Sequence, residues 1–530
     1  MKKKQIALLV LIFMGAGLLT AQKKIKKNNE MPVRVITADI NKIKGSTKTV
    51  WRKCVGAGRA NEGLRADWQE QLRLLKKECG FEYIRMHGLL TDDMGVYFED
   101  KKGNPIYNWQ YIDQLYDFLI DIDVKPFVEL SFMPNALASG KETCFWWKGN
   151  VTPPKSYEKW FEFIKALTQH FTDRYGKEEV QTWYFEVWNE PNLKYFFPST
   201  QEEYFKLYDF TVRAIKSVSK DYRVGGPATA GNVWITELIE YCQKNNCPID
   251  IITTHDYGVT KGFLDADGKA GTILSKDTKA ISRSVNKSRI QIKNSSKPNL
   301  ELHYTEWSTS YSPYDNVHDS YQSASFILDK IKGTEDAANS MSYWTFTDIF
   351  EEVGLRTTPF HGGFGLLNYQ SIKKPAYYAY QFLNQLGENE IMNNDSASWV
   401  CTDAKGGIQI LLWNFTILLK SDSVNNNVFY KLDLPAKNIG KVQINLANVP
   451  IGKYCLEFYK VGYRVNDAYA TYMDLGSPSQ LTKQQVNVIK NANNGSPIET
   501  IVLDVNEDKV FKRDFELREN DVCLVRLIKL

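Results

Sequence analysis

The sequence predicts an α/β protein with two domains, a (β/α)8 TIM barrel followed by an antiparallel β-sandwich. The chain has 530 residues, which exceeds the size at which a single hydrophobic core usually stops growing. Between about residues 52 and 350, short apolar runs alternate with helical patterns. After about residue 386 the helical periodicity largely disappears, and strands alternate with turns.

The first part of the chain contains eight apolar runs that we expect to form strands. They span residues 53–56, 81–86, 126–130, 182–188, 224–226, 249–254, 300–305 and 340–346. Parallel strands separated by helices over some 300 residues are typical of a (β/α)8 barrel, in which the chemistry lies at the carboxyl ends of the strands.

The segments between these runs carry the period of amphipathic helices. One apolar face runs from Leu64 to Leu75, and Gly80 follows as a stop signal. Residues 157–175 repeat the pattern with Ser156 as a candidate cap. Thr200 and Glu203 have the spacing of a capping box, which predicts the start of another helix.

The second domain is expected to contain mainly strands, with one short helix near residues 482–489. The predicted strands span residues 407–415, 428–434, 441–446, 454–459, 498–505 and 521–528. We place the barrel at residues 46–385 and the sandwich at residues 386–530, and we expect residues 22–45 to join the sandwich.

Residues 1–21 have the pattern of an export signal, in which a basic start, Lys2 to Lys4, precedes an apolar stretch too short to span a bilayer comfortably. We therefore expect a periplasmic or extracellular protein. The eight cysteines permit disulfides in such a compartment, and Cys242 and Cys247 are close enough in sequence to close a small loop. CxxC and HExxH spacings are absent from the sequence, so we expect no metal and no cofactor.

The charge distribution excludes some classes of partner. The net charge is only +4, and the basic residues are scattered rather than clustered, which argues against a nucleic-acid partner. After the leader, apolar stretches do not reach the length of a membrane span. Aromatic residues make up 13% of the chain, and aromatic rings offer flat faces for sugar C–H groups as well as core volume.

Two glutamates, Glu190 and Glu306, each follow an apolar run that reads as a buried strand. Both carboxylates should therefore project where the sheet meets solvent. Hydrolysis of a glycosidic bond by the usual route needs two such groups, one protonated and one ionised. The alternative for Glu190 is a helix-capping or ion-paired carboxylate, because Pro191 and Asn192 mark a turn.

Further polar and aromatic residues fall at the predicted strand ends. These candidates are Arg85, His87, Asn189, His255, Tyr257, Trp344, Glu351 and Glu352. Glu351 and Glu352 could instead be a solvated loop pair, and we interpret His303 and His361 as structural. For Trp146 and Trp147, core packing and sugar stacking remain equal alternatives.

The chain resembles glycoside hydrolase family 39, and within it the bacterial β-xylosidases. The matching stretches run in order from about Val33 to Leu530. They are CVGAGR, YIRMHGLLTDDMGVY, PFVELSFMPNALASG, GNVTPPKSYEKW, FEVWNEPNLK, HYTEWSTSYSP, SYWTFTDIFEE and FHGGFGLL.

The resemblance implies a retaining double displacement, with Glu190 as general acid and base and Glu306 as nucleophile. It implies that Asn189 binds the sugar 2-hydroxyl, and that Arg85 and Tyr257 keep the nucleophile ionised. The other positions that match the family's sugar pocket are His87, Phe132, His255, Trp344, Glu351 and Glu352. The expected partner is an oligosaccharide or other glycoside, attacked at its non-reducing end.

Two alternatives remain. The sequence departs from the xylosidase pattern at HDYG (255–258), at Trp307 and in VGLRTT after Glu352, so the sugar could differ. A uronic-acid sugar, as in the iduronidase branch of the family, would call for basic residues such as Lys261 or Arg356. A carbohydrate-binding protein on a disabled barrel is the other alternative, and the retained glutamates argue against it.

Overall fold

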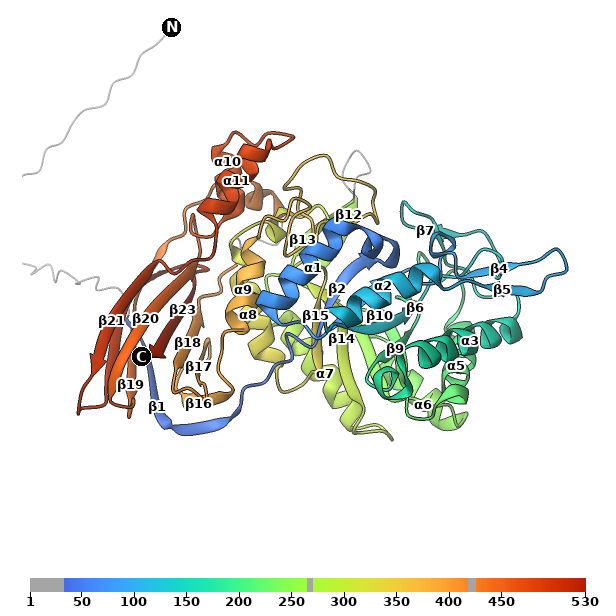
Figure 1. Ribbon diagram of the computed structural model, residues 1–530, viewed down its shortest axis with the longest axis horizontal. Coiled ribbons are helices and arrows are strands. Elements are labelled where there is room, and N and C mark those ends of the chain that lie inside the picture. Colours follow the sequence, from blue (N-terminus) through green and yellow to red (C-terminus); the bar gives the residue numbers. More distant parts are fainter. Residues whose placement is uncertain (1–32, 265–269, 418–425) are drawn as a thin grey trace, which may run out of the picture.

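The computed structural model describes residues 33–264, 270–417 and 426–530. A barrel surrounded by helices lies beside a domain made mostly of strands (Figure 1). The predicted leader, residues 1–21, lies outside the described residues. None of the described helices is both long and apolar enough to cross a bilayer.

Eight parallel strands close into the predicted barrel. In chain order they are β2 (Cys54–Arg59), β3 (Tyr83–His87), β6 (Lys125–Leu130), β9 (Tyr184–Val187), β10 (Arg223–Ala230), β11 (Ile251–Tyr257), β14 (Glu301–Ser308) and β15 (Ser340–Tyr343). Each predicted strand overlaps one of them, so the barrel prediction is confirmed.

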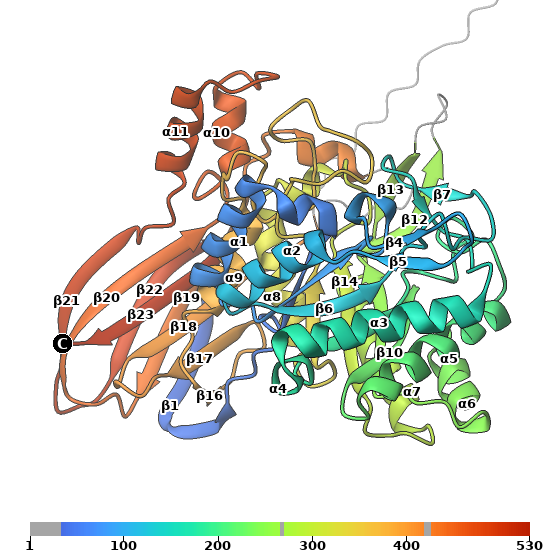
Figure 2. The same cartoon turned by 45° about the vertical axis from the view of Figure 1, so that its right-hand side comes forward.

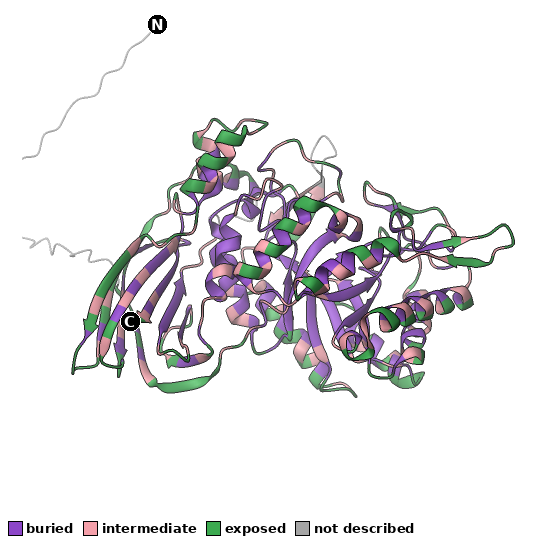
Figure 3. Ribbon diagram, viewed as in Figure 1, coloured by how far each residue is buried: buried purple, intermediate pink, exposed green. Residues whose placement is uncertain are grey.

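Nine helices of the described residues belong to the barrel domain. They are α1 (Ala66–Cys79), α2 (Gln110–Asp121), α3 (Tyr157–Tyr175), α4 (Lys177–Val180), α5 (Gln201–Val218), α6 (Ile235–Lys244), α7 (Ala280–Lys293), α8 (Gln322–Thr334) and α9 (Pro375–Leu383). The outer faces of α1 to α7 are exposed, whereas α8, α9 and the barrel strands are mostly buried (Figure 3).

The predicted helix ends are largely confirmed. Gly80 ends α1 in the left-handed conformation, and the Ser156 hydroxyl accepts the Lys159 amide at the start of α3. At α5 the Thr200 hydroxyl accepts the Glu203 amide. The reciprocal half of the predicted capping box does not form, because the Glu203 carboxylate instead accepts a hydrogen bond from the Tyr157 hydroxyl at 2.5 Å.

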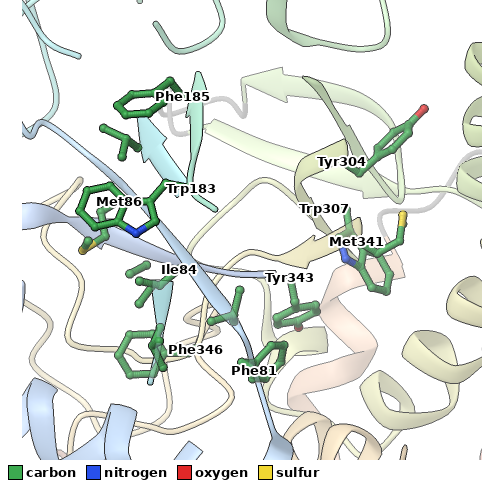
Figure 4. Close-up of a cluster of buried hydrophobic side chains, with 14 of the residues drawn as sticks. Phe81, Ile84, Met86, Trp183, Phe185, Tyr304, Trp307, Met341, Tyr343 and Phe346 are labelled. Carbon is green, nitrogen blue, oxygen red and sulfur yellow. The ribbon is translucent and has the colours of Figure 1, made fainter. Parts of the chain in front are cut away.

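Side chains alternate between the two faces of each barrel strand. In β3, Ile84 and Met86 belong to the large core beneath the helices, whereas Tyr83 belongs to a small cluster in the barrel interior. Figure 4 shows part of the large core. The same alternation in β9 puts Phe185 into this core and leaves Glu186 for the barrel interior.

Three small antiparallel hairpins extend from the barrel loops. They are β4 (Tyr97–Glu99) with β5 (Pro105–Tyr107), β7 (Thr143–Cys144) with β8 (Gly149–Asn150), and β12 (Val259–Leu264) with β13 (Ala270–Leu274). Two short 3-10 turns, Ala60–Leu64 and Asp92–Met94, precede them in the chain, and a third, Asn316–His318, follows β14.

The second domain is a sandwich whose nine strands are linked in one sheet order, β21-β20-β23-β18-β17-β16-β1-β19-β22. Their bounds are β1 (Val33–Ser46), β16 (Asn389–Asn393), β17 (Ser398–Thr402), β18 (Ile408–Trp413), β19 (Asn438–Ala447), β20 (Gly452–Val461), β21 (Glu499–Val505), β22 (Phe511–Arg518) and β23 (Val522–Lys529). Phe458 of β20 and Phe515 of β22 meet at 4.9 Å between ring centroids. Opposite ends of the sheet therefore face each other across one core.

Several features of this domain differ from the sequence prediction, which did not include the strands β16, β17 and β22. Residues 428–434 were predicted as a strand, but Asn426–Lys431 forms a 3-10 helix, whose Tyr430 packs with Val317 and Leu274 of the barrel domain. Tertiary packing thus overrides the local strand pattern. Strand β1 pairs parallel to β19, so the sheet is not purely antiparallel. An unpredicted helix, α10 (Ala468–Asp474), precedes α11 (Lys483–Ala492).

The two domains share buried contacts. The Trp399 indole donates to Glu335 after α8 at 3.0 Å, and the Ser325 hydroxyl donates to Asn520 at 2.9 Å. Helices α10 and α11 rise beyond the sheet (Figure 2) and pack on Phe360 of the barrel domain. All eight cysteines are free thiols, including Cys242 and Cys247.

Candidate active site

A cavity of about 690 Å³ lies where the carboxyl ends of several barrel strands meet the loops that follow them. Its lining includes His87, Asn189, Glu190, Asn192, Asp256, Tyr257, Glu306, Trp344 and Glu352. Five of the eight polar and aromatic strand-end candidates therefore meet in one cavity with the two glutamates, Glu190 and Glu306. This is the end of a (β/α)8 barrel at which the chemistry is expected.

Glu190 sits three residues beyond the end of β9, in a tightly held turn. Its φ is +43°, a left-handed conformation that is uncommon for a residue with a side chain. The Glu190 amide donates to the Ala228 carbonyl at 2.8 Å, and the Asn192 side chain exchanges two hydrogen bonds with the Ala230 backbone. These contacts to β10 fix the direction of the carboxyl group.

Glu306 lies within β14, two residues before its end, rather than at the strand end that the sequence suggested. Its Oε1 accepts a hydrogen bond from Arg85 at 2.7 Å, and its Oε2 accepts one from the Tyr257 hydroxyl at 2.6 Å. Both oxygens of this carboxylate are therefore held by donors, which stabilises the ionised form.

The two glutamates face each other. One carboxyl oxygen of Glu190, one of Glu306 and a ring nitrogen of His255 all lie within 4.8 Å of one another. Glu190 is 8% exposed and Glu306 is 5% exposed. This spacing is close to the roughly 5 to 5.5 Å of retaining glycosidases and well short of the roughly 6.5 to 9.5 Å of inverting ones.

The environment of Glu190 suits a proton donor. Burial and the nearby charge of Glu306 raise the pKa of Glu190 well above its ordinary value, and Arg85 only partly offsets this. Burial and the charge of Glu306 therefore both favour the protonated carboxyl group. The partly buried Glu352 also has a raised pKa, because of burial and then the charges of Glu306 and Glu62.

A buried ion cluster beneath the cavity orients Glu306. We call Arg85, Glu129, Glu186 and Glu306 the Arg85 cluster. Arg85 is fully buried and contacts Glu129 at 2.7 Å, Glu186 at 2.5 Å and Glu306 at 2.7 Å. It also donates to the Asn189 side-chain oxygen at 2.9 Å. One guanidinium thus positions both Glu306 and Asn189, the residue before Glu190.

Sequence analysis did not single out Glu129 and Glu186. Burial tends to raise the pKa of Glu129, but Arg85 and His87 outweigh it and hold that pKa below its ordinary value. Both acids are isolated charges inside apolar strands, in PFVEL and YFEV. Because charges are rarely buried unless they are paired, such an interruption is a usable sequence signal.

His87, Trp344 and Glu352 line one corner of the cavity. The His87 Nδ1 lies 2.7 Å from Glu129, and its Nε2 lies 3.5 Å from both Glu306 and Glu352. The Trp344 ring packs against the His87 ring at 4.7 Å between centroids. This corner combines hydrogen-bonding groups with a flat apolar face, as a sugar site requires.

Some predicted site residues lie outside the cavity lining. Phe132 is fully buried and packs on Trp188 and Phe196, so it supports the wall from behind. Arg85 and His255 are likewise fully buried below the lining. The Glu351 carboxylate pairs with Arg59 at 2.7 Å and does not line the cavity, although its neighbour Glu352 does.

The remaining aromatic and histidine candidates also lie elsewhere. Trp147 packs on Phe132 and Phe145, whereas Trp146 is exposed, and neither lines the cavity. His303 lies 2.8 Å from the Ser340 hydroxyl, in the barrel interior, and His361 lies 3.0 Å from the Thr358 carbonyl.

The cavity also has an apolar wall that sequence analysis missed. Its residues are Phe145, Leu193, Phe196, Val259 and Pro313, with the tyrosines Tyr195 and Tyr311. Leu193, Tyr195 and Tyr311 are each more than a third exposed, so they lie near the mouth. Most of these residues follow the strands in irregular loops, where hydrophobic periodicity gives no signal.

Among the described residues, Glu190, His255 and Glu306 form the one group whose donor atoms are spaced for a metal ion. A protonated Glu190 is a poor ligand for a cation, because carboxyl ligands bind in their ionised form. The geometry therefore fits a pair of reacting carboxyl groups better than a metal centre.

The family profile described as "Glycosyl hydrolases family 39" matches residues 34–502. The chain belongs to this family. It is 42% identical over 468 residues to a β-xylosidase of Caldicellulosiruptor saccharolyticus, in a match that covers 85% of this chain and 90% of that protein. The chain is therefore a glycoside hydrolase.

Solved structures give the same family. The GH39 enzyme from Xanthomonas axonopodis pv. citri superposes with a TM-score of 0.92 at 40% identity, covering 96% of this chain and 99% of that one. A monomeric β-xylosidase from Caulobacter crescentus gives a TM-score of 0.90 at 40% identity, covering 94% of this chain and all of that one. The barrel-plus-sandwich architecture is thus shared with these neighbours.

Proposed function

We propose that this glycoside hydrolase is a retaining exo-acting β-xylosidase that releases xylose from the non-reducing ends of xylo-oligosaccharides or other plant glycans. The spacing of Glu190 and Glu306 within 4.8 Å supports this proposal more than any other observation. The similarity to β-xylosidases at 42% and 41% identity supports the choice of sugar.

In the first step, Glu306 attacks the anomeric carbon while Glu190 gives its proton to the departing glycosidic oxygen. The bond between the anomeric carbon and the leaving group breaks, and an ester bond to Glu306 forms. Arg85 and Tyr257 hold the attacking carboxylate in position through their contacts with its two oxygens. Asn189, which accepts a hydrogen bond from Arg85, binds the sugar 2-hydroxyl in this proposal.

In the second step, water attacks the anomeric carbon and the ester bond to Glu306 breaks. Formation of the ester has removed the negative charge of Glu306, so the pKa of Glu190 falls and its carboxylate can accept the proton of the attacking water. Glu190 is protonated again, Glu306 is ionised again, and the product keeps the β configuration.

The lining of the cavity favours a neutral sugar. Among its described residues it contains no lysine or arginine, while Glu352 and His87 offer partners for hydroxyl groups. Lys261 is exposed on β12, and Arg356 stacks on Tyr314 at 3.8 Å, so neither lines the cavity. A uronic-acid glycoside would leave its carboxylate facing an excess of negative charge.

A panel of aryl β-glycosides that share one leaving group and differ only in the sugar tests the substrate. We expect the β-xyloside to give the highest kcat/KM and the uronic-acid glycosides to be inactive. Proton NMR of the first product should show β-xylose before mutarotation. A higher kcat/KM on another sugar would refute the choice of xylose, and α-xylose as the first product would refute the retaining mechanism.

We also propose that the protein is exported. The apolar segment after Lys2 to Lys4 motivates this proposal. Expression with and without residues 1–21, followed by fractionation, tests it. Cytoplasmic retention of the full-length chain would contradict it.

A further inference from the structure

A chain of four hydrogen-bonded side chains links Glu190 to β9, the strand that precedes it. It runs from Glu190 to His255 on β11, then to Thr305 on β14, and then to Glu186 on β9. His255, Thr305 and Glu186 are fully buried. They exchange hydrogen bonds with one another rather than with bulk solvent, so the position of each hydrogen is set by its neighbours.

The hydroxyl of Thr305 fixes the first hydrogen. It lies 2.7 Å from Oε1 of Glu186, whose Oε2 accepts from Arg85 at 2.5 Å. Burial raises the pKa of Glu186, and the charge of Arg85 opposes this shift. Paired with Arg85, the carboxylate accepts a hydrogen bond at each oxygen, and such bonds are about twice as strong as neutral ones. Thr305 therefore donates its single hydroxyl hydrogen to Glu186.

The second hydrogen follows from the first. The Thr305 oxygen lies 3.2 Å from Nε2 of His255. Because Thr305 donates its hydrogen to Glu186, its oxygen can only accept a hydrogen bond from Nε2. Burial and the charges of Arg85 and His87 hold the pKa of His255 well below its ordinary value. The imidazole of His255 is therefore neutral, and its one N–H is at Nε2.

The Nδ1 of His255 is then a bare acceptor. It lies 2.9 Å from Oε1 of Glu190 and 3.5 Å from Oε2 of Glu306. The short contact is favourable only if Glu190 carries the proton. We propose that Thr305 and Glu186 fix the tautomer of His255, so that His255 acts as a positioning residue that keeps the proton on Glu190 in the resting enzyme.

The other charged groups around Glu190 act through distance rather than through a hydrogen bond. Glu306 from β14 and Glu129 from β6 favour the protonated form of Glu190, and Arg85 from β3 opposes it. Their influence does not depend on the Thr305 hydroxyl. Removing that hydroxyl thus changes the His255 contact while leaving these charges in place.

The fixed tautomer also favours the second chemical step. When Glu190 has given its proton to the leaving group, its carboxylate faces the Nδ1 lone pair without a hydrogen between them. The contact becomes favourable again when the attacking water transfers a proton to Glu190 as its oxygen bonds to the anomeric carbon and the ester to Glu306 breaks. This inference rests on the proposed role of Glu190 as acid and base.

The substitution Thr305→Val removes the hydroxyl at nearly constant shape, and Thr305→Ser keeps the hydroxyl as a matched control. Without the hydroxyl, His255 can adopt the Nδ1–H tautomer, donate to the Glu190 carboxylate and lower its pKa. On xylobiose, the alkaline limb of kcat/KM should move to lower pH by about one unit in Thr305→Val. Thr305→Ser should retain the wild-type profile.

A dinitrophenyl xyloside, which needs no proton in the first step, distinguishes this effect from general damage. In Thr305→Val its kcat/KM should stay within about twofold of wild type. Equal losses on both substrates with an unmoved alkaline limb would overturn the inference and indicate a purely structural role. Failure of the proposed function itself would show instead in Glu190→Ala, as equal loss on the two substrates.

Neutron diffraction of the wild-type protein tests the tautomer without any variant. We expect deuterium on Nε2 of His255, none on Nδ1, and one on the Glu190 carboxyl group. Deuterium on Nδ1 of His255 would overturn the inference even if Thr305→Val failed to fold.

Discussion

Two buried ion clusters in the barrel domain differ in what they contact. The Arg85 cluster sets one guanidinium against three carboxylates and opens onto the cavity through Glu306. A second group, the Lys374 cluster, consists of Lys374, Asp319 and Asp348, with contacts of 2.7 and 2.9 Å. It lies behind the loop that carries Phe364 to the cavity.

The side chains of the Lys374 cluster form hydrogen bonds with the backbone of that loop. Asp319 accepts the Gly362 amide at 2.7 Å, Asp348 accepts the Gly365 amide at 2.7 Å, and Lys374 donates to the Gly363 carbonyl at 2.8 Å. Burial alone therefore does not mark a functional charge. A surplus of like charge beside a cavity, with pKa values pushed apart, does.

The largest loss of kcat/KM should follow substitution of Glu306, which joins the Arg85 cluster to the cavity. We expect Glu306→Ala to lower kcat/KM by at least about 10⁴-fold on every glycoside, because the covalent step is lost. Glu190→Ala should keep much of its activity on substrates with very acidic leaving groups, which depart without a proton. Equal losses in the two variants on a dinitrophenyl xyloside would refute the assigned roles.

The next comparison removes the cation of each cluster. Arg85→Met and Lys374→Met should each destabilise the protein by about 3 to 5 kcal/mol, because each leaves buried carboxylates unpaired. In the folded fraction, Arg85→Met should also lower kcat/KM by about 10²-fold or more. Lys374→Met should change kcat/KM by less than about tenfold. Denaturant unfolding measures the two losses of stability, and steady-state kinetics measures the two losses of kcat/KM. Equal losses of kcat/KM would contradict a functional difference between the two clusters.

The neighbours Glu351 and Glu352 repeat the contrast on a smaller scale. Glu352 lines the cavity, whereas Glu351 pairs with Arg59 outside it. Glu352→Ala should lower kcat/KM for aryl xylosides by about tenfold or more, the worth of one strong hydrogen bond to the sugar. Glu351→Ala should stay within about threefold of wild type. The reverse order would mean that Glu351 reaches the substrate.

The smallest predicted effect concerns Glu62, which is buried beside Glu351. Burial first, and then the charge of Glu351, raise the pKa of Glu62 to about 8 in the folded state. The folded protein thus binds this proton more tightly than the unfolded chain does. The resulting stability is complete below about pH 4.3 and is lost as the pH rises toward 8.

Glu62→Gln removes this titration while keeping the shape of the side chain. The melting temperature of the variant relative to wild type should therefore rise between pH 5.5 and pH 8. A difference in melting temperature that stays constant over this interval would show that the carboxyl group does not titrate there.

The predictable part of the molecule follows from periodic patterns. Eight apolar runs and their helices predicted the barrel, and acids directly after two of the runs predicted Glu190 and Glu306. Local sequence could not reveal that Asn426–Lys431 forms a 3-10 helix that packs against the barrel. It also could not separate Glu351 from Glu352, because their difference arises from Arg59, which is distant in the chain.

The sequence does hold signals for some of the missed residues. Glu129 and Glu186 interrupt apolar strands, and in a closed barrel such a charge must find a partner inside. The chain of hydrogen bonds through Thr305 left no such signal in the sequence. It depends on side chains of three strands converging at hydrogen-bond distance, which the sequence of any one strand does not specify.

Trapping the intermediate tests the central claim most directly. A 2-deoxy-2-fluoro-β-xyloside with a good leaving group should form a long-lived ester, because the fluorine slows the second step more than the activated first one. Peptide mass spectrometry should then locate the fluorosugar on Glu306. A label on Glu190, or turnover without any covalent adduct, would contradict the double displacement proposed for these two glutamates.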